Sequence, residues 1–312
     1  MILASEEKKE KDGISTEFTA YNWEELQFYL KRCNDNLIQE LKAEFGDNKP
    51  YNQIWYRGET NTGYYLEPTL LRNLKDKENH DNTCKNTRER YEFFKTQCDG
   101  SPEVAFYGDY TQADYLALMQ HYGIETNLLD FTDNAFIALY LALKYFSDEE
   151  KIDCLKQARE KQRSVVLWMF SPALYNLYRQ RILENYLDER IQGDDTDLDI
   201  KTRGRELFGL ENTNLNGVIP NLSIPRNEKL YARYIFGESW MDERYKNGLD
   251  NQVPPLAVWT PRLNHRIRAQ SGSFVAFDVY ADPHNYKTLG AVQTDFMRKD
   301  IYCQTVSLQD HY

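Results

Sequence analysis

Three short stretches carry polar side chains that could bind or transform a ligand. The first is WYRGE at residues 55–59, where Arg57 follows two aromatic residues and precedes Gly58. A guanidinium is a planar fork of donors that matches a phosphate or a carboxylate, and a glycine lets a ligand come close to the backbone. The alternative is a structural arginine balanced by Glu59 or by another internal carboxylate, because a buried arginine needs partners.

The second stretch is QHYGIETNLLDFT, which places an unusual density of polar groups between apolar runs. Its candidate site residues are Gln120, His121, Thr126, Asp130 and Thr132. A carboxylate inside an apolar strand must meet an arginine, backbone donors or a ligand, since desolvation otherwise raises its pKa. For Asp130, an ion pair with Arg57 on a neighbouring strand and a role in binding are both open.

Simpler explanations exist for the other polar residues of this stretch. Thr126 and Thr132 can be explained as caps of turns. His121 stands at the end of an expected helix, where a structural role is commoner than catalysis. Because no second histidine lies near it in the sequence, a metal site is not expected.

The third stretch is NHRIRAQSGSFVAF at residues 264–277. Arg266 and Arg268 are followed by Gln270 and a Ser-Gly-Ser turn that leads into an expected strand. Backbone donors and cations therefore converge where this strand begins, as at many anion sites. A surface loop explains Arg268 easily, whereas Gln270 beside the turn is a candidate for the site.

Composition narrows the classes of function. The chain has 312 residues, 41% hydrophobic and 28% charged, which is typical of a folded protein. The net charge of -11 disfavours non-specific binding to nucleic acids and anionic membranes. The 5 cysteines have no metal-ligand spacing, and no signal sequence or membrane span is evident, so we expect a cytoplasmic protein. Nucleotide-binding P-loops, GxGxxG, GxSxG and HExxH motifs are absent from the sequence.

Periodicity predicts alternating helices and strands. Expected helices are Trp23 to Phe45, ending near Gly46, Arg88 to Lys95, Thr111 to Tyr122, ending at Gly123, and a helix over AFIALYLALKYF. Expected strands are QIWYRGE, NLLDFT, SVVLWMF, LAVWT and SFVAFDVY. Residues 73–90 look like a solvated loop or the exposed start of a helix. AFIALYLALKYF is apolar nearly all round, which predicts a buried helix with an N-cap among Thr132, Asp133 and Asn134.

The order of these elements predicts an α+β fold with a mixed or antiparallel central sheet and flanking helices. Residues 1–16 are polar and are expected to form a mobile tail. Residues 17–312 are expected to form a single domain, in which 171–250 is an insertion or helical subdomain.

Taken together, the three stretches resemble a known family. WYRGE, then LEPTLLR, then MQHYGIETNLLDFT with NAFIALYLA behind it, and finally NHRIRAQSGSF resemble the FRG-domain family, named for its Phe/Tyr-Arg-Gly motif. The resemblance covers roughly residues 20–285. One departure is Asn127, because the family commonly has an arginine before Leu-Leu-Asp that could pair with Asp130 or with a ligand.

The resemblance implies a site and a setting. FRG domains occur in bacterial and phage-associated proteins, and their layout is similar to an ADP-ribosyltransferase core. By this analogy Arg57 would hold the pyrophosphate or ribose of NAD, residues 126–132 would line the nicotinamide side, and Gln270 would lie near the position of the catalytic glutamate. Since Gln270 carries no charge, Asp130 or Glu59 would have to supply the carboxylate.

Two hypotheses of function follow. The first is an NAD-using ADP-ribosyltransferase or NAD glycohydrolase acting as a bacterial toxin or antiphage effector, with Arg57, Asp130 and Gln270 as catalytic residues. Its ligand contacts would be Tyr56, Gly58, Glu59, Gln120, His121, Thr126, Thr132 and Arg266. The second is a non-catalytic module that senses a nucleotide or a phage component, which fits an uncharged Gln270 better. A weaker third reading is a phosphodiester enzyme that uses His121 and Asp130 as acid and base.

Overall fold

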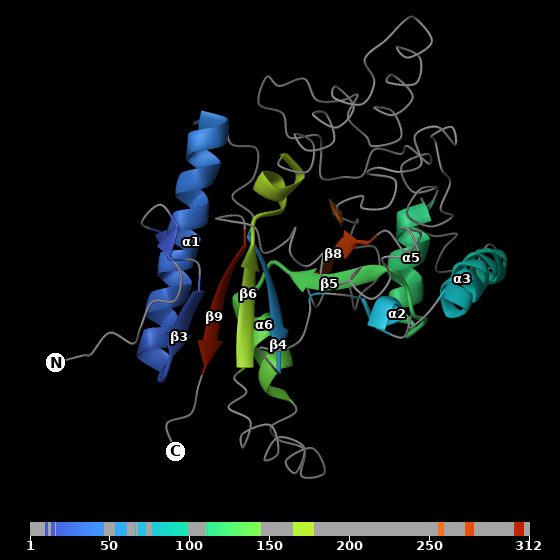
Figure 1. Cartoon of the computed structure of the whole chain (residues 1–312), viewed down its shortest axis with the longest axis horizontal. Helices are drawn as coiled ribbons and strands as arrows, with labels where there is room; N and C mark the ends of the chain where they lie inside the picture. Colours follow the sequence, from blue (N-terminus) through green and yellow to red (C-terminus); the bar gives the residue numbers. More distant parts are fainter. Residues whose placement is uncertain are drawn as a thin grey trace, which may run out of the picture. The chain divides into compact units, whose positions relative to one another are not determined.

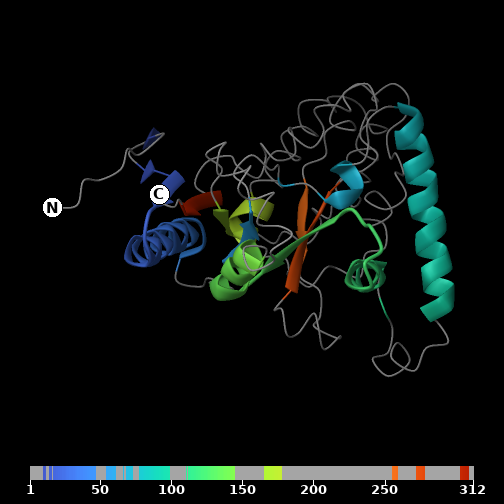
Figure 2. The ribbon, with the colours of Figure 1, turned by 90° about the horizontal axis from the view of Figure 1, so that it is seen from below.

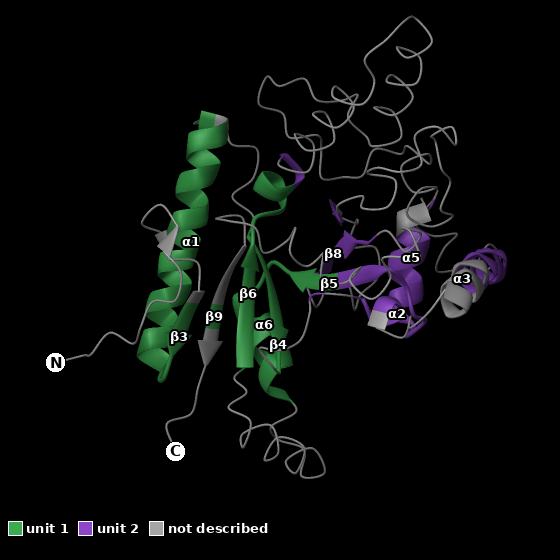
Figure 3. Ribbon diagram, in the orientation of Figure 1, with its two compact units in different colours: residues 1–65, 130–175, 297–312 green, residues 66–129, 176–296 purple. Residues whose placement is uncertain are grey.

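The structure, a computed structural model, describes the helices and strands of the chain and some of the turns beside them (Figure 1). The described residues are 10–11, 14–15, 17–46, 54–60, 66, 68–72, 77–98, 110, 112–144, 165–177, 255–258, 272–277 and 303–308. The chain divides into two compact units (Figure 3). Unit 1 comprises residues 1–65, 130–175 and 297–312, and unit 2 comprises residues 66–129 and 176–296. The division falls inside the strand Leu128–Thr132. Its first residues belong to unit 2, and its last residues belong to unit 1.

A mixed sheet forms the centre of unit 1. Its strands, in spatial order, are β3 (Glu17–Ala20), β9 (Cys303–Leu308), β6 (Val165–Phe170), β4 (Trp55–Glu59) and the end of β5 (Leu128–Thr132). β3 and β9 run parallel, and the other neighbours run antiparallel. The expected mixed sheet with helices is therefore confirmed.

Two capped helices, α1 (Trp23–Phe45) and α6 (Ala135–Leu143), pack on the same face of this sheet (Figure 2). The side chain of Asn22 caps α1 by accepting a hydrogen bond from the backbone of Glu25, and Gly46 ends the helix with φ 63°. The side chain of Asn134 caps α6 in the same way. The end of α1 at Gly46 and the start of α6 after Asn134 agree with the sequence-based expectation.

The expectation that α6 is buried on all sides is wrong. Ala138 and Ala142 are 0% exposed and face the sheet, whereas Phe136 and Tyr140 are each 67% exposed. A helix that rests on one face of a sheet buries only the side turned toward that sheet, however apolar its other side is.

Gly58 lies where α6 crosses β4. An ideal Cβ atom at this position would lie 2.0 Å from the carbonyl oxygen of Ala138 and 2.7 Å from the Cβ atom of Ala142. Any side chain here would therefore push the helix off the strand. The glycine therefore serves the packing of α6 against β4.

Unit 2 contains three described helices, α2 (Thr69–Arg72), α3 (Lys77–Cys98) and α5 (Gln112–His121). It also contains the antiparallel pair β7 (Leu256–Val258) and β8 (Gly272–Ala276). Helix α5 ends at Gly123, which has φ 78°, as expected. Helix α3 begins about ten residues earlier than expected. Among the residues of α3 whose burial is described, 86–98, Thr87 and Tyr91 are buried. The ring of Tyr91 packs edge-on against that of Tyr115.

Some strands have no counterpart among the expected elements. Strand β9 lies between β3 and β6, although its sequence CQTVSL is too polar to stand out. The segment expected to be a tail contains the two-stranded hairpin β1 (Glu10–Lys11) and β2 (Ile14–Ser15). Most of the expected insertion at 171–250 lies outside the described residues. In the part of the chain that the structure describes, no helix combines the length and the apolar composition needed to cross a membrane.

Candidate site at Arg57 and Glu59

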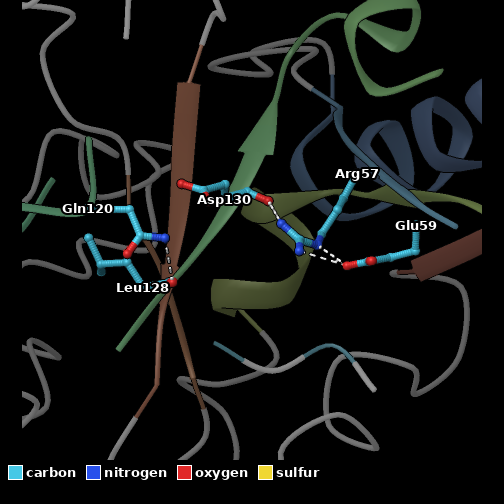
Figure 4. Close-up of polar contacts among 5 residues, drawn as sticks. All are labelled: Arg57, Glu59, Gln120, Leu128 and Asp130. Carbon is cyan, nitrogen blue, oxygen red and sulfur yellow. Dashed lines mark hydrogen bonds and ion pairs between the residues drawn. The ribbon is translucent and has the colours of Figure 1, made fainter. Parts of the chain in front are cut away.

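An ion pair runs along strand β4 between Arg57 and Glu59 (Figure 4). Nε of Arg57 donates to Oε1 of Glu59 at 2.7 Å, and Nη2 lies 2.7 Å from the same oxygen. Nη1 donates to the backbone carbonyl of Asp130 at 2.7 Å. Residues two apart on a strand point to the same face, so the strand geometry itself brings the two charges together.

The guanidinium keeps part of its binding capacity. Arginine has five N–H donors, and these contacts use one each on Nε, Nη1 and Nη2. One N–H on each of Nη1 and Nη2 therefore has no partner within the described residues. The side chains of Arg57 and Glu59 are 18% and 11% exposed, so the pair is mostly buried but within reach of solvent. A guanidinium with N–H groups of this kind can bind an oxyanion by donating hydrogen bonds to it.

The site lies on an aromatic face of the sheet. Trp168 of β6 pairs with Arg57, and Phe170 pairs with Trp55, which shares the face of Arg57. The ring centroids of Trp55 lie 6.1 Å from Phe170 and 6.4 Å from Phe131. All four aromatic side chains are buried. Apolar surroundings strengthen the attraction within the ion pair and make the loss of either partner costly.

Tyr56 and Gly58 lie on the opposite face of β4, toward the helices. The hydroxyl of Tyr56 donates to Oδ1 of Asn34 on α1 at 3.2 Å. Burial raises the pKa of Tyr56, and the neighbouring Cys33 raises it further. Because Gly58 packs against α6 on this same face, neither residue is placed to contact a ligand bound at Arg57. The assignment of both residues to a ligand site therefore stays a prediction.

Asp130 contributes its backbone to the site rather than a buried charge. Within the buried strand β5 its side chain is the exposed one. The carboxylate therefore keeps its contact with water, and the expectation of a desolvated acid is wrong. The ion pair of Arg57 is formed with Glu59, as the structural alternative predicted.

The polar groups of QHYGIET hold the turn between α5 and β5 in unit 2. Oγ1 of Thr126 donates to Oε1 of Gln120 at 2.5 Å and accepts from the backbone N–H of Leu128 at 3.2 Å. Nε2 of Gln120 donates to the carbonyl of Leu128 at 3.2 Å (Figure 4). These bonds satisfy backbone groups at a helix end and a strand start, which accounts for part of the polar density of this stretch.

Thr132 and His121 have local contacts of their own, and two further candidates lie outside the described residues. Thr132 caps the turn before α6 by accepting a hydrogen bond from the backbone of Asn134 at 3.2 Å. His121 is the last residue of α5, with its ring 5.8 Å from that of Tyr122. Arg266 and Gln270 lie outside the described residues. No group of three His, Cys, Asp or Glu side chains that could hold a metal occurs among the residues that were described.

Asn127 has a role that the sequence did not reveal. Its buried side chain donates from Nδ2 to the carbonyl of Phe277 at 2.8 Å, and its own carbonyl accepts from the backbone N–H of Phe277 at 2.9 Å. The residue thus joins the start of β5 to the end of β8 within unit 2. The only signal in the sequence was an amide at the edge of a buried apolar run.

Comparison with family models supports the resemblance seen in the sequence. Residues 52–151 match the model of the FRG domain. This match includes WYRGE and QHYGIETNLLDFT but is narrower than the range of roughly 20–285 expected from the motifs, since it excludes NHRIRAQSGSF. No curated protein and no solved structure matches the chain. The similarity to the FRG domain is therefore shown for residues 52–151.

Proposed function

We propose that the FRG domain binds NAD at Arg57 and that the protein cleaves the bond between nicotinamide and ribose. The product would be free ADP-ribose if water attacks, or an ADP-ribosylated acceptor if a macromolecule attacks. The single observation that carries the proposal is the Arg57–Glu59 pair, in which a cation, with two N–H groups that have no partner within the described residues, lies beside a carboxylate on one face of a strand.

Each partner of the pair has a chemical role in this proposal. The two N–H groups of Arg57 that have no partner among the described residues would bind a pyrophosphate oxygen through charge-assisted hydrogen bonds. Glu59 would stabilise the positive charge that develops on the ribose C1′ carbon as nicotinamide leaves. The nicotinamide nitrogen keeps the electron pair of the broken bond, and the attacking hydroxyl or water loses a proton.

The proposal also covers the fold, further residues and the biological role. We propose that the core is ADP-ribosyltransferase-like, that Asp130 and Gln270 assist the reaction, and that the protein acts as a cytoplasmic toxin or antiphage effector. The residue Asp130 is exposed in strand β5. The family match and the acidic composition are compatible with these roles.

A second candidate is a binding module that senses a nucleotide or a phage component without turnover. The observation that favours it is that Oε1 of Glu59 already accepts two contacts from Arg57 at 2.7 Å. A carboxylate paired in this way has less negative charge to offer a transition state. Anion binding at the unused donors of Arg57 would need no such charge.

One pair of measurements separates the two candidates. The melting temperature of the full chain is followed with increasing NAD, and NAD consumption is followed by chromatography. A rise in melting temperature with release of nicotinamide supports the enzyme, and a rise without release supports the sensing module. If millimolar NAD produces neither effect, both NAD-based proposals are rejected.

Variants then locate the activity. Arg57→Lys retains the charge but loses the fork, so it should weaken NAD binding by about tenfold. Glu59→Gln should bind NAD but lose turnover by at least about a hundredfold if this carboxylate acts in catalysis. Asp130→Asn tests the exposed acid, and Arg90→Lys on α3 is the matched control, since Arg90 is an exposed arginine in unit 2.

A further inference from the structure

Strand β5 has little backbone pairing with β4 where it enters unit 1. Asp130 is the first residue of β5 in this unit, and Thr132 is the last residue of the strand. Of the described residues, Tyr56 and Thr132 are the one register pair between the two strands, whereas β4 and β6 pair at five positions. Segments with few backbone pairings open locally more readily than the centre of a sheet.

The side chain of Arg57 supplies a second tie between the two strands. Its Nη1 donates to the backbone carbonyl of Asp130 at 2.7 Å, two residues before the pairing at Thr132 (Figure 4). The same guanidinium holds Glu59 and belongs to the candidate site. The position of segment 130–132 on β4 is therefore linked to the orientation of Arg57.

Two contacts fix the plane of the guanidinium, and one of them depends on this segment. Nε and Nη2 both meet Oε1 of Glu59, so Glu59 holds the group at a single oxygen. A planar group held at one point can still tilt, and the carbonyl of Asp130 on Nη1 is the second point. The N–H groups of Arg57 that have no partner within the described residues are thus oriented while segment 130–132 is closed on β4. Preorganised donors bind an oxyanion more tightly than mobile ones, because less freedom is lost on binding.

We propose that oxyanion binding at Arg57 and closure of segment 130–132 on β4 are coupled. The inference rests on the proposed function for the identity of the oxyanion, which is the pyrophosphate group of the ligand. Because linkage is reciprocal, a bound oxyanion stabilises the closed segment by the same factor by which closure raises the affinity. Couplings of this kind change an affinity by roughly 5–150-fold.

The closed segment also supports the start of α6. Oγ1 of Thr132 accepts a hydrogen bond from the backbone N–H of Asn134 at 3.2 Å. The side chain of Asn134 accepts in turn from the backbone N–H groups of Phe136 at 2.9 Å and Ile137 at 3.3 Å. An oxyanion at Arg57 is therefore expected to slow amide exchange at Asn134 and in the first turn of α6, as well as in the segment itself.

Hydrogen exchange followed by mass spectrometry on the full chain tests the coupling, with inorganic pyrophosphate as the probe. Calorimetry first gives the dissociation constant of pyrophosphate, and sodium chloride at equal ionic strength is the blank. Saturating pyrophosphate should slow exchange in peptides covering residues 130–137 by at least about fivefold, the lower end of such couplings. Peptides from the first turn of α1 should exchange at an unchanged rate.

Matched variants separate the coupling from occupancy of Arg57. Thr132→Val keeps Arg57 but removes the hydroxyl that accepts from Asn134, so exchange at 130–137 should become faster. Through the coupling, the same variant should raise the dissociation constant of pyrophosphate by about threefold or more. Thr19→Val is the control, because Thr19 lies on β3, which β9 and β6 separate from β4, and neither quantity should change.

The outcomes for the coupling and for the enzyme are distinct. A chain that does not bind pyrophosphate, or binds it without slower exchange at 130–137, would overturn the coupling. A Thr132→Val variant with faster exchange but an unchanged dissociation constant would do the same. Release of nicotinamide from NAD without slowed exchange rejects the coupling alone, and slowed exchange without NAD consumption rejects the enzyme alone.

Discussion

The Cβ position of Gly58 lies 2.0 Å from the carbonyl oxygen of Ala138, closer than any real side chain could approach. The glycine of the Tyr-Arg-Gly motif is thus explained by helix packing, and the arginine beside it points to the opposite face of the strand. Tyr56 and Gly58 hold β4 to the helices, while Arg57 and Glu59 are left for the site.

The first prediction concerns that contact. Gly58→Ala should lower the free energy of unfolding by about 3 kcal/mol, because the new methyl group meets a backbone atom that a rotamer change cannot move. The measurement is urea denaturation. Gly123→Ala is the control, since its Cβ position has nothing within 4 Å and its φ of 78° alone should cost about 1 kcal/mol. Equal losses in the two variants would refute the packing explanation.

The second prediction concerns the mostly buried ion pair. Arg57→Met and Glu59→Met should each destabilise the protein by about 3 kcal/mol, because each leaves an uncompensated charge in apolar surroundings. The double variant should be more stable than the sum of the single losses implies. A double-mutant cycle by denaturation gives the coupling energy, and additive losses would show that the two residues do not act as a pair.

The third prediction concerns pH. The raised pKa of Tyr56 means that the folded state holds the phenolic proton more tightly than the unfolded state, whose value is about 10. This contribution to stability is complete below about pH 10 and is lost as the pH rises through the higher folded-state pKa. The wild-type chain should therefore lose more stability than Tyr56→Phe does as the pH rises above about 10.

A separate effect at neutral pH serves as the check on that variant. Tyr56→Phe removes the hydrogen bond to Asn34 and should cost about 1 kcal/mol at pH 7. If melting curves of the two proteins run parallel through the alkaline range, titration of Tyr56 does not contribute to stability there.

The fourth prediction concerns the link between β5 and β8. Asn127→Ala removes the donor to the carbonyl of Phe277 and leaves that buried group without its side-chain partner, at a cost of about 2 kcal/mol. Asn127→Asp replaces the donor with an acceptor that faces the same carbonyl, so it should be at least as damaging. Hydrogen exchange at the amide of Phe277 reports the link directly, and unchanged exchange in both variants would contradict it.

Local features were accessible from the sequence. The end of α1 followed from Gly46, the end of α5 from Gly123, and the start of α6 from Asn134, because caps depend on residues a few positions apart. The partner of Arg57 was also within reach of local reasoning, since Glu59 is two residues away on the same strand. The FRG resemblance likewise rested on short contiguous motifs.

Only the tertiary structure decided which faces and which distant segments meet. The exposure of Asp130, the packing of Gly58 on Ala138, and the bond between Asn127 and Phe277 depend on strands and helices far apart in the chain. Strand β9 escaped the sequence pattern because its place between β3 and β6 comes from backbone hydrogen bonds, which carry no side-chain signature. The periodicity of the sequence shows that a residue faces another element of the fold. Which element that is depends on the topology of the chain.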